Sequence, residues 1–485
     1  MDTVYFIGID IGTQGARVVL LGSNGDLLAQ KEEGFPLSRQ SREEQSPQDW
    51  WQSCHQSLRA LLNEVKQHID LQKIKAITVT STSGTILALD KNDEPLHPAI
   101  MYSDNRSAAE ALRCREAAAA AGGKGWAAFN ASSGLPKMLW FLHRYPDKAA
   151  RLGRFIHAAD YLLGKLSGRY DVTDHTNALK SGYDIHSYSW PSYIWERLPL
   201  KKEWLQQVVA PGQPIGHLRP LLADSLGISR GTVVAAGITD GCASQVAAGA
   251  VRPGDWNTTI GTTLVIKGVT TREIEDPSGA LYCHRHPEGY WMPGGASNTG
   301  ADWINKLFPG NIDELNKAAA TLIPTSHLAW PLMQEGERFP FSAPSARGFF
   351  PEGISGAGLF ASCMEGVAYI ERYAYERVAR LCGEPVQRVY TAGGGSNSDT
   401  WLTIRSNTLN LPVRKMKHVS GAVGAAILAA SKTHFSSIME ATASLTQPEK
   451  EILPRPELSG PYNDNYHRFI NTLNEMGLLP ACQYA

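Results

Sequence analysis

Two glycine turns, each following an apolar run, are the first features of the sequence that could bind phosphate. Gly12-Thr13-Gln14-Gly15 comes shortly after Asp10, and Gly261-Thr262-Thr263 comes in the second half of the chain. Backbone N–H groups and threonine hydroxyls in such turns donate hydrogen bonds to phosphate oxygens. Asp10 would then bind the accompanying Mg²⁺ through water, because this hard cation prefers carboxylates and keeps its waters. Ordinary hairpins contain similar turns, and only the matching pair favours a phosphate site.

Asp240 is a carboxylate that could serve as a base. It lies between an apolar strand and a helix of small residues, in Ile238-Thr239-Asp240-Gly241. A carboxylate at such a place can be a simple helix cap, and the sequence leaves this alternative open. If Asp240 faces the substrate, it is placed to accept the proton of a hydroxyl group. Phosphoryl transfer needs such a residue together with a metal and donors for the phosphate charge.

A third glycine run would let the backbone approach a flat ligand. Gly393-Gly394-Gly395-Ser396-Asn397 follows a predicted strand, and Asn397 supplies both a donor and an acceptor. The same run is typical of a flexible strand-to-helix loop, which remains the alternative. The sequence contains no Gly-x-x-x-x-Gly-Lys-Ser/Thr pattern, so a Walker-type nucleotide site is excluded.

The elements that must position these residues alternate between strands and helices. Residues 49–65 carry apolar side chains at helical spacing. Short apolar or β-branched runs predict strands at 4–11, 17–21, 27–29, 74–80 and 86–89. Thr82, Ser83 and Gly84 therefore follow the end of a strand, where they could face a cleft. The alternation indicates an α/β fold.

The second half of the chain repeats part of the first. Ile260-Gly261-Thr262-Thr263 and the apolar residues after it are similar to Ile11-Gly12-Thr13-Gln14 and the residues that follow there. We interpret this as an internal duplication. It predicts two domains, residues 1–248 and 249–485, that face each other across a central cleft. Beyond about residue 435 the pattern predicts a helical tail without a motif.

The composition excludes several classes of partner. The chain has 485 residues, with 46 Lys and Arg against 47 Asp and Glu, and a formal net charge of −1. This balance argues against binding to nucleic acid or to anionic membranes, which attract basic proteins. The seven cysteines are never spaced Cys-x-x-Cys, and we find neither a signal peptide nor a stretch suited to cross a bilayer. We expect a cytoplasmic protein whose partners are small molecules.

The motifs together resemble the FGGY carbohydrate kinases, within the superfamily of sugar kinases, heat-shock chaperones and actin. The resemblance covers almost the whole chain and implies two duplicated α/β domains of the actin-like, ribonuclease H-like ATPase fold. The first domain would hold the sugar and phosphate site, and the second would hold the nucleotide site. The resemblance rests on Gly8–Thr13, Glu44–Trp51, Pro95–Ile100, Asp104–Arg106, Thr239–Gly241, Gly336–Arg338, Arg347–Phe349, Glu365–Ala368 and Gly393–Gly395.

The resemblance also implies a role for each site residue. Asp240 would be the catalytic base and would contact the substrate, and the sugar would lie against Thr82, Ser83 and Asp104. The cofactors would be ATP and Mg²⁺, with the metal at Asp10 through water. ATP and its phosphates would be bound by Asp10, Gly12, Thr13, Gln14, Gly15, Gly261, Thr262, Thr263, Gly393, Gly394 and Asn397.

The segment Ser81-Thr82-Ser83-Gly84-Thr85 bears on the choice of sugar. Xylulose kinases look like Gln-Met-His-Gly at this place. The chain is instead similar to a smaller group of plant and cyanobacterial sugar kinases that act on D-ribulose, in which the serine matching Ser83 contacts the sugar. The resemblance therefore favours conversion of D-ribulose to D-ribulose 5-phosphate.

Three other functions remain open. They are a D-xylulose kinase, a kinase of another sugar or polyol, and a non-catalytic ATP-switch protein of the same superfamily. A homodimer is compatible with the sequence, which does not determine the oligomeric state.

Overall fold

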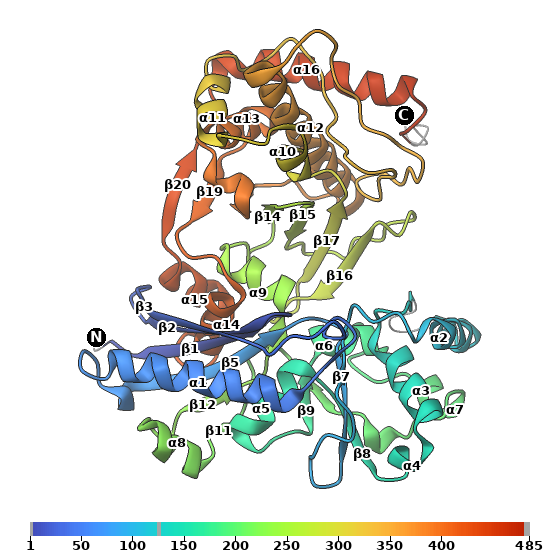
Figure 1. The fold of residues 1–485 in the computed structure, drawn as a ribbon, viewed down its shortest axis with the longest axis vertical. Coiled ribbons are helices and arrows are strands. Elements are labelled where there is room, and N and C mark those ends of the chain that lie inside the picture. Colours follow the sequence, from blue (N-terminus) through green and yellow to red (C-terminus); the bar gives the residue numbers. More distant parts are fainter. Residues whose placement is uncertain (1–2, 124–127, 480–485) are drawn as a thin grey trace. The chain divides into compact units, whose positions relative to one another are not determined.

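The computed structural model describes residues 3–123 and 128–479 (Figure 1). The chain divides into two compact units. Unit 1 comprises Met1–Ala247, Pro287–Gly289 and His418–Thr446, and unit 2 comprises Ala248–His286, Tyr290–Lys417 and Gln447–Ala485. The domains expected at 1–248 and 249–485 stay a prediction, and the units differ from them chiefly in that residues 418–446 pack with unit 1.

Unit 1 is built around a mixed sheet in which a hairpin pairs with a parallel strand. β1 (Tyr5–Ile11) is antiparallel to β2 (Gly15–Gly22) and parallel to β5 (Ile74–Ser81). The predicted strands at 4–11, 17–21 and 74–80 are thereby confirmed. The sheet continues with β3 (Leu27–Gly34) beside β2, with β12 (Val233–Ala235) and β13 (Ile238–Thr239) beside β5, and with β11 (Pro214–His217) beside β12.

The other elements of unit 1 are helices and short strands. The helices are α1 (Pro47–Val65), α2 (Ala108–Ala120), α3 (Gly134–Arg144), α4 (Pro146–Ala149), α5 (Ala158–Ser167), α6 (His175–Ala178), α7 (Tyr193–Glu196), α8 (Pro220–Leu226), α9 (Asp240–Ala247), α14 (Gly421–Ser431) and α15 (Ile438–Leu445). Two smaller sheets contain β4 (Glu44–Gln45), β7 (Ala99–Ile100), β6 (Ile86–Asp90) and β8 (Leu152–His157), and β9 (Val172–Asp174) with β10 (Gln207–Val209). The predicted helix at 49–65 is confirmed as α1.

Unit 2 repeats the strand directions of the main sheet of unit 1. β14 (Asp255–Ile260) is antiparallel to β15 (Leu264–Gly268) and parallel to β18 (Arg388–Ala392), as β1 is to β2 and β5. The repeat that the two glycine turns predicted is therefore present in the topology. The sheet is completed by β17 (Trp291–Ser297) beside β15, β16 (Leu281–Arg285) beside β17, β19 (Val413–Met416) beside β18 and β20 (Pro448–Ile452) beside β19.

The helices of unit 2 are α10 (Asp302–Leu307), α11 (Ile312–Ala319), α12 (Gly356–Cys382), α13 (Asp399–Leu409) and α16 (Pro456–Glu475), and Figure 1 shows α12 and α16 as its longest ones. The tail beyond residue 435 is not wholly helical, because β20 forms a strand at the edge of the sheet. The exposed, charged residues of β20 lack the apolar pattern of a buried strand, as is common for edge strands. No helix in the described part of the chain is a candidate membrane span.

The two faces of β1 have different partners. Ile7 and Ile9 are buried in a core that includes residues of α1 and α5. Because side chains alternate along a strand, Gly8 and Asp10 point to the opposite face. That face meets α14 so closely that a Cβ atom on Gly8 would collide with the carbonyl oxygen of Ala422.

α14 has no counterpart among the predicted elements. Its residues are apolar or small from end to end, and all of them are buried. A helix enclosed on every side lacks the polar face that produces a helical period in the sequence. The sequence analysis therefore missed the helix that the site of unit 1 most depends on.

Replacing Gly424 of α14 by alanine should destabilise unit 1. A Cβ atom there would collide with the carbonyl oxygen of Ala243 in α9, and overpacking of this kind costs about 1–3 kcal/mol. We expect the unfolding temperature measured by calorimetry to fall by several degrees. Gly358→Ala in α12 is the matched control and should not lower it, since nothing lies within contact of a Cβ atom there. An unchanged unfolding temperature in Gly424→Ala would contradict the close contact of α14 and α9.

Candidate active site

The carboxylates of Asp10 and Asp240 are brought together in unit 1. Asp10 lies near the end of β1, Asp240 is exposed at the first residue of α9, and α14 packs against both elements. The pKa of Asp10 is raised to about 7, first by burial and then by the negative charge of Asp240, against the opposing charge of Arg17. A Cβ atom at Gly421 would lie 2.5 Å from Oδ2 of Asp10. The glycine at the first residue of α14 therefore leaves room for this carboxylate in its present position, and a larger residue there would make the Asp10 side chain shift.

The sequence left open whether Asp240 is a helix cap or a base. Its Oδ1 accepts a hydrogen bond from the N–H of Gly241 at 2.6 Å, which is an interaction with the start of its own helix. The residue is nevertheless exposed. Its carboxylate can therefore be reached by a ligand, and its role as a base stays a prediction.

The first glycine turn is held by side chains from the start of α1 and the residues before it. Gln45 Nε2 donates a hydrogen bond to the carbonyl oxygen of Thr13 at 2.9 Å, and Trp50 Nε1 donates to Gln45 Oε1 at 2.8 Å. These bonds fix the orientation of the Thr13 peptide group. The sequence analysis used Gln45 for the family resemblance, and Trp50 for the resemblance and for the helix at 49–65, and it missed this role.

The turn itself is short and partly open to solvent. The N–H of Gly12 donates to the carbonyl oxygen of Gly15 at 3.1 Å. A Cβ atom on Gly15 would come within 2.6 Å of the carbonyl oxygen of Glu33, so only glycine fits beside β3. Thr13 is partly exposed and Gln14 is exposed, which leaves one side of the turn accessible to a ligand.

Ser83 has a buried hydroxyl oxygen that no described residue hydrogen-bonds. Its neighbour Thr82 is different, because Thr82 Oγ1 and Thr85 Oγ1 share a hydrogen bond of 3.0 Å. Gly84 has a φ of 93° and lies so close to the carbonyl of Ser132 that a Cβ atom would collide with it. A buried polar atom without a partner costs free energy, and ligands or water commonly satisfy such atoms. Within this segment, the Ser83 hydroxyl is the best candidate for a ligand contact.

Asp104 is buried and is paired within the protein. It accepts hydrogen bonds from Arg106 N–H at 2.7 Å and from Arg106 Nε at 2.5 Å. Lys137 is also buried, and its Nζ donates to the carbonyl oxygen of Ala131. Burial lowers the pKa of Lys137 to about 7, although the charge of Asp104 acts in the opposite direction. Asp104 thus lies beside the guanidinium of Arg106 and close to the amine of Lys137, and its contact with a sugar stays a prediction.

In unit 2, a cavity of about 380 Å³ brings the other two glycine runs together. Gly261 and Thr262 line it from one run, and Gly394 and Asn397 line it from the other. Aromatic side chains of α12 and α13 complete the wall. Pockets for small organic ligands typically have about 300–1,000 Å³ and combine apolar walls with a few polar groups. This cavity therefore suits a ligand that has both a flat ring and a polar part.

The third glycine run is shaped by its contact with β14. Gly393 has a φ of 81°, and a Cβ atom there would lie 2.5 Å from the carbonyl oxygen of Ile260. Asn397 Oδ1 accepts a hydrogen bond from Lys415 Nζ at 3.1 Å. Gly393 is not among the residues that line the cavity, and neither is Thr263. These two residues instead belong to the turns that carry the lining residues.

The turn at Gly261–Thr263 is supported by a buried carboxylate. Glu337 accepts hydrogen bonds from Ser297 Oγ and from Thr299 Oγ1, both at 2.8 Å. The neighbouring Gly300 lies against the carbonyl of Thr262, where a Cβ atom would collide. Glu337 therefore holds the end of β17, which lies beside the turn at Gly261–Thr263. The sequence analysis used Glu337 only for the family resemblance.

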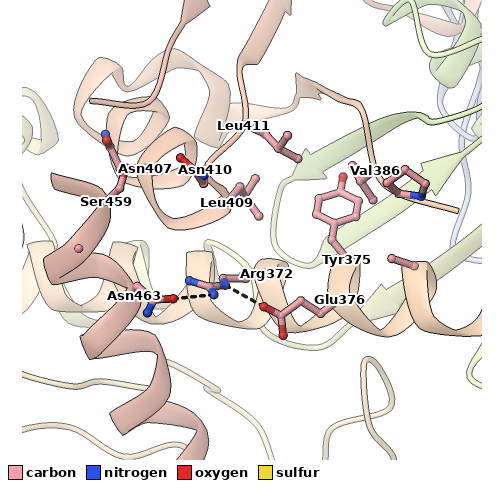
Figure 2. Close-up of a pocket in the computed structure, with 13 residues that line it drawn as sticks. Arg372, Tyr375, Glu376, Val386, Asn407, Leu409, Asn410, Leu411, Ser459 and Asn463 are labelled. Carbon is pink, nitrogen blue, oxygen red and sulfur yellow. Dashed lines mark hydrogen bonds and ion pairs between the residues drawn. The ribbon is translucent and has the colours of Figure 1, made fainter. Parts of the chain in front are cut away.

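A further pocket of unit 2, of about 560 Å³, is lined by none of the predicted site residues (Figure 2). Its arginine, Arg372, is already paired with Glu376 Oε1 and Asn463 Oδ1, both at 2.9 Å. We therefore place this pocket outside the candidate active site. Across residues 3–123 and 128–479, no group of three or more His, Cys, Asp or Glu side chains is arranged to hold a metal ion.

Comparison with known proteins matches both halves of the chain to one family. The model of the N-terminal domain of the FGGY family of carbohydrate kinases matches residues 5–247, and that of the C-terminal domain matches residues 256–433. Gluconokinase from Bacillus subtilis (strain 168) is 26% identical over 500 residues, which cover 97% of this chain and 95% of that protein. Xylulose kinase from Escherichia coli (strain K12) is 28% identical over 443 residues, which cover 87% and 89%.

Solved structures agree with the fold. A xyloylose kinase from Brucella ovis has a TM-score of 0.84 at 24% identity, covering 98% of this chain and 100% of that one. Glycerol kinase from Plasmodium falciparum with ADP has a TM-score of 0.82 at 16% identity, covering 99% of each chain. The expected two-domain α/β fold of the ribonuclease H-like, actin-like class is thereby confirmed.

Replacing Lys137 by methionine should raise thermal stability, and most at low pH. The pKa of Lys137 falls from 10.5 to about 7 on folding, so the unfolded chain holds this proton more tightly. The wild type should therefore gain stability as the pH rises from 7 towards 10.5, and below pH 7 it should bear the full cost of the buried charge. We expect calorimetry to show a larger gain for Lys137→Met at pH 6 than at pH 9.

The matched control is Lys75→Met, which changes an exposed lysine of β5. It should shift the unfolding temperature at neither pH. A stability difference between Lys137→Met and wild type that does not vary with pH would contradict the lowered pKa.

Proposed function

The chain belongs to the FGGY family of carbohydrate kinases, and from this premise we propose that it transfers the γ-phosphoryl group of ATP to a terminal hydroxyl of D-ribulose, giving D-ribulose 5-phosphate. Family membership makes it a sugar phosphotransferase. The observation that supports the choice of sugar is the buried hydroxyl of Ser83, which no described residue hydrogen-bonds, because the resemblance to D-ribulose kinases implies a sugar contact for the serine at this place.

Asp240 is the proposed base for the sugar hydroxyl. O5 of the sugar attacks the γ-phosphorus, the bond from that phosphorus to the oxygen of ADP breaks, and the hydroxyl proton passes to the carboxylate. The exposed position of Asp240 at the start of α9 supports this role. The accessible side of the Gly12–Gly15 turn supports a role for that turn in holding the phosphates.

Asp10 is the proposed residue for Mg²⁺, through water. Its raised pKa reflects burial and the neighbouring charge of Asp240, and a nearby cation would offset both. Mg²⁺, when bound with ATP, neutralises charge on the phosphates. A single carboxylate near a second one suits a magnesium ion that keeps most of its waters.

The cavity of unit 2 is the proposed nucleotide site. Its aromatic walls suit the adenine ring, and the backbone at Gly394 allows the ring to approach. Gly261, Thr262 and Thr263 would bind the γ-phosphate. The glycerol kinase with ADP shares the fold of this chain.

Other features bear on location and on competing substrates. No disulfide joins the described cysteines, which supports the proposed reducing, cytoplasmic location. A homodimer stays a prediction. Relatives named xylulose kinase and gluconokinase make D-xylulose and gluconate the competing acceptors, and a non-catalytic ATP switch would show no acceptor at all.

Turnover with a panel of acceptors tests the reaction and its base. We expect kcat/KM for D-ribulose to exceed that for D-xylulose, gluconate and glycerol by about tenfold or more. Asp240→Asn should lower kcat by about 10²-fold or more, because the proton then has no acceptor, while ATP affinity measured by calorimetry is unchanged. Asp224→Asn, which changes an exposed residue of α8, is the control and should keep full turnover.

The following results would contradict these predictions. If kcat/KM is higher for D-xylulose or gluconate than for D-ribulose, that acceptor is the substrate and D-ribulose is not. Turnover near that of the wild type in Asp240→Asn would remove Asp240 as the base. Hydrolysis of ATP that no acceptor stimulates would favour the ATP-switch protein.

Ser83→Ala tests the sugar contact. Loss of one hydrogen bond to the sugar should cost about 1–2 kcal/mol, seen as a roughly 5- to 30-fold loss in kcat/KM for D-ribulose with the KM for ATP unchanged. Because no described residue bonds the Ser83 hydroxyl, the unfolding temperature should not fall. Ser57→Ala is the matched control, since it removes another buried, unpartnered serine hydroxyl, in α1. Equal kcat/KM for D-ribulose in wild type and Ser83→Ala would contradict the proposed contact between Ser83 and the sugar.

A further inference from the structure

The hydroxyl of Thr176 contacts the backbone immediately before Asp240. The N–H of Thr239 donates a hydrogen bond to Thr176 Oγ1 at 3.0 Å, and Thr176 Oγ1 donates to Asp174 Oδ1 at 2.5 Å. All three residues are buried. The two bonds link the turn that starts α6 to the strand end that leads into α9.

The direction of these bonds follows from the chemistry of Asp174. Burial raises its pKa to about 6, and the hydrogen bonds from Thr176 and Asn177 act in the opposite direction. At pH 7.5 the carboxylate is therefore mainly ionised and can only accept hydrogen bonds. Thr176 has one hydroxyl proton, which goes to Asp174, so its oxygen is left to accept the N–H of Thr239.

Asp174 is well suited to hold Thr176 in one orientation. Its Oδ1 also accepts the N–H of Thr176 at 2.8 Å and that of Asn177 at 3.2 Å. Its Oδ2 accepts Asn177 Nδ2 at 2.6 Å. With this set of donors around it, the carboxylate has little freedom to rotate. The Thr176 hydroxyl is therefore held by a rigid neighbour.

The strand end that carries Thr239 needs this acceptor. β13 pairs in parallel only with β5 among the described strands, and Thr80 Oγ1 of β5 donates to the carbonyl oxygen of Ile238 at 2.7 Å. A buried backbone N–H on the unpaired side would be costly without a partner. Thr176 supplies the acceptor that a further strand would otherwise supply. It thereby fixes the backbone one residue before Asp240.

We propose that Thr176, oriented by Asp174, is a positioning residue that fixes the Asp240 carboxylate for its work as a base. The proposal rests on the role proposed above for Asp240. Thr176 is buried and bonds the backbone of Thr239, so it would act through the backbone and not by contact with the sugar or ATP. A shift of about 1 Å at a reacting group can cost about 10²-fold in rate, so loss of this anchor should appear in kcat.

Three variants separate positioning from general damage. Thr176→Val has nearly the same shape but neither accepts from Thr239 nor donates to Asp174, and Thr176→Ser keeps both bonds. Thr78→Val is the matched control, because it removes a buried β5 hydroxyl that donates to the carbonyl of Ala235 at 2.6 Å, farther from Asp240. If Thr176→Val does not fold, Thr176→Cys replaces it, since a thiol is a weak hydrogen-bonding group.

We expect kcat to fall about tenfold or more in Thr176→Val, with the KM for sugar and ATP within about threefold of wild type. Thr176→Ser should restore kcat to within about twofold, and Thr78→Val should keep it even if its unfolding temperature falls. In the Asp240→Asn background, Thr176→Val should change the residual turnover little, because a positioning residue has nothing left to position. An equal loss of kcat in both backgrounds would overturn the proposal.

Hydrogen exchange tests the anchor without using activity. The amide of Thr239, followed by mass spectrometry of overlapping peptides, should exchange faster in Thr176→Val than in wild type, Thr176→Ser or Thr78→Val. Unchanged exchange at Thr239 would overturn the proposal by itself. If the wild type phosphorylates no acceptor, the proposed function fails, and the exchange result alone decides whether Thr176 holds residue 239.

Discussion

Contact between backbones that only glycine permits is the constraint on which the site of unit 1 depends. α14 reaches β1 at Gly8 and reaches α9 through Gly424, and in both places a single methyl group would collide with a carbonyl oxygen. Because β1 and α9 both pack closely against α14, Asp10 and Asp240 lie near each other. The pKa of Asp10 is raised, first by burial and then by the nearby charge of Asp240. A site that gathers negative charge in this way is costly without a ligand and well suited to a cation.

Buried polar side chains from distant segments do the remaining positioning. Gln45 holds the carbonyl of Thr13, Glu337 holds the strand end beside the second turn, and Thr176 holds the N–H of Thr239. Each satisfies its partners inside the protein, which makes the supported backbone rigid. Ser83 differs from these three side chains, since its buried oxygen has no partner among the described residues.

The elements that the sequence predicted correctly are those whose signals are local. The hairpins at both glycine turns, the helix α1 and the strand β5 each have a pattern within about twenty residues. α14 and β20 were missed for opposite reasons, because α14 is apolar on every side and β20 is exposed and charged. The supporting roles of Gln45, Glu337 and Thr176 were missed because each acts across more than thirty residues of chain.

The sequence by itself determined the family, the repeated hairpins and the residue types that could bind phosphate or accept a proton, because these depend on short motifs and their order. Only the tertiary structure decided that α14 belongs with β1 and α9, that Thr82 is paired with Thr85, and that no described residue bonds the Ser83 hydroxyl. Burial and hydrogen bonding depend on which distant segments come together, and no local pattern records that. For this reason the chemistry could be anticipated from the sequence, whereas the supports that hold it in place could not.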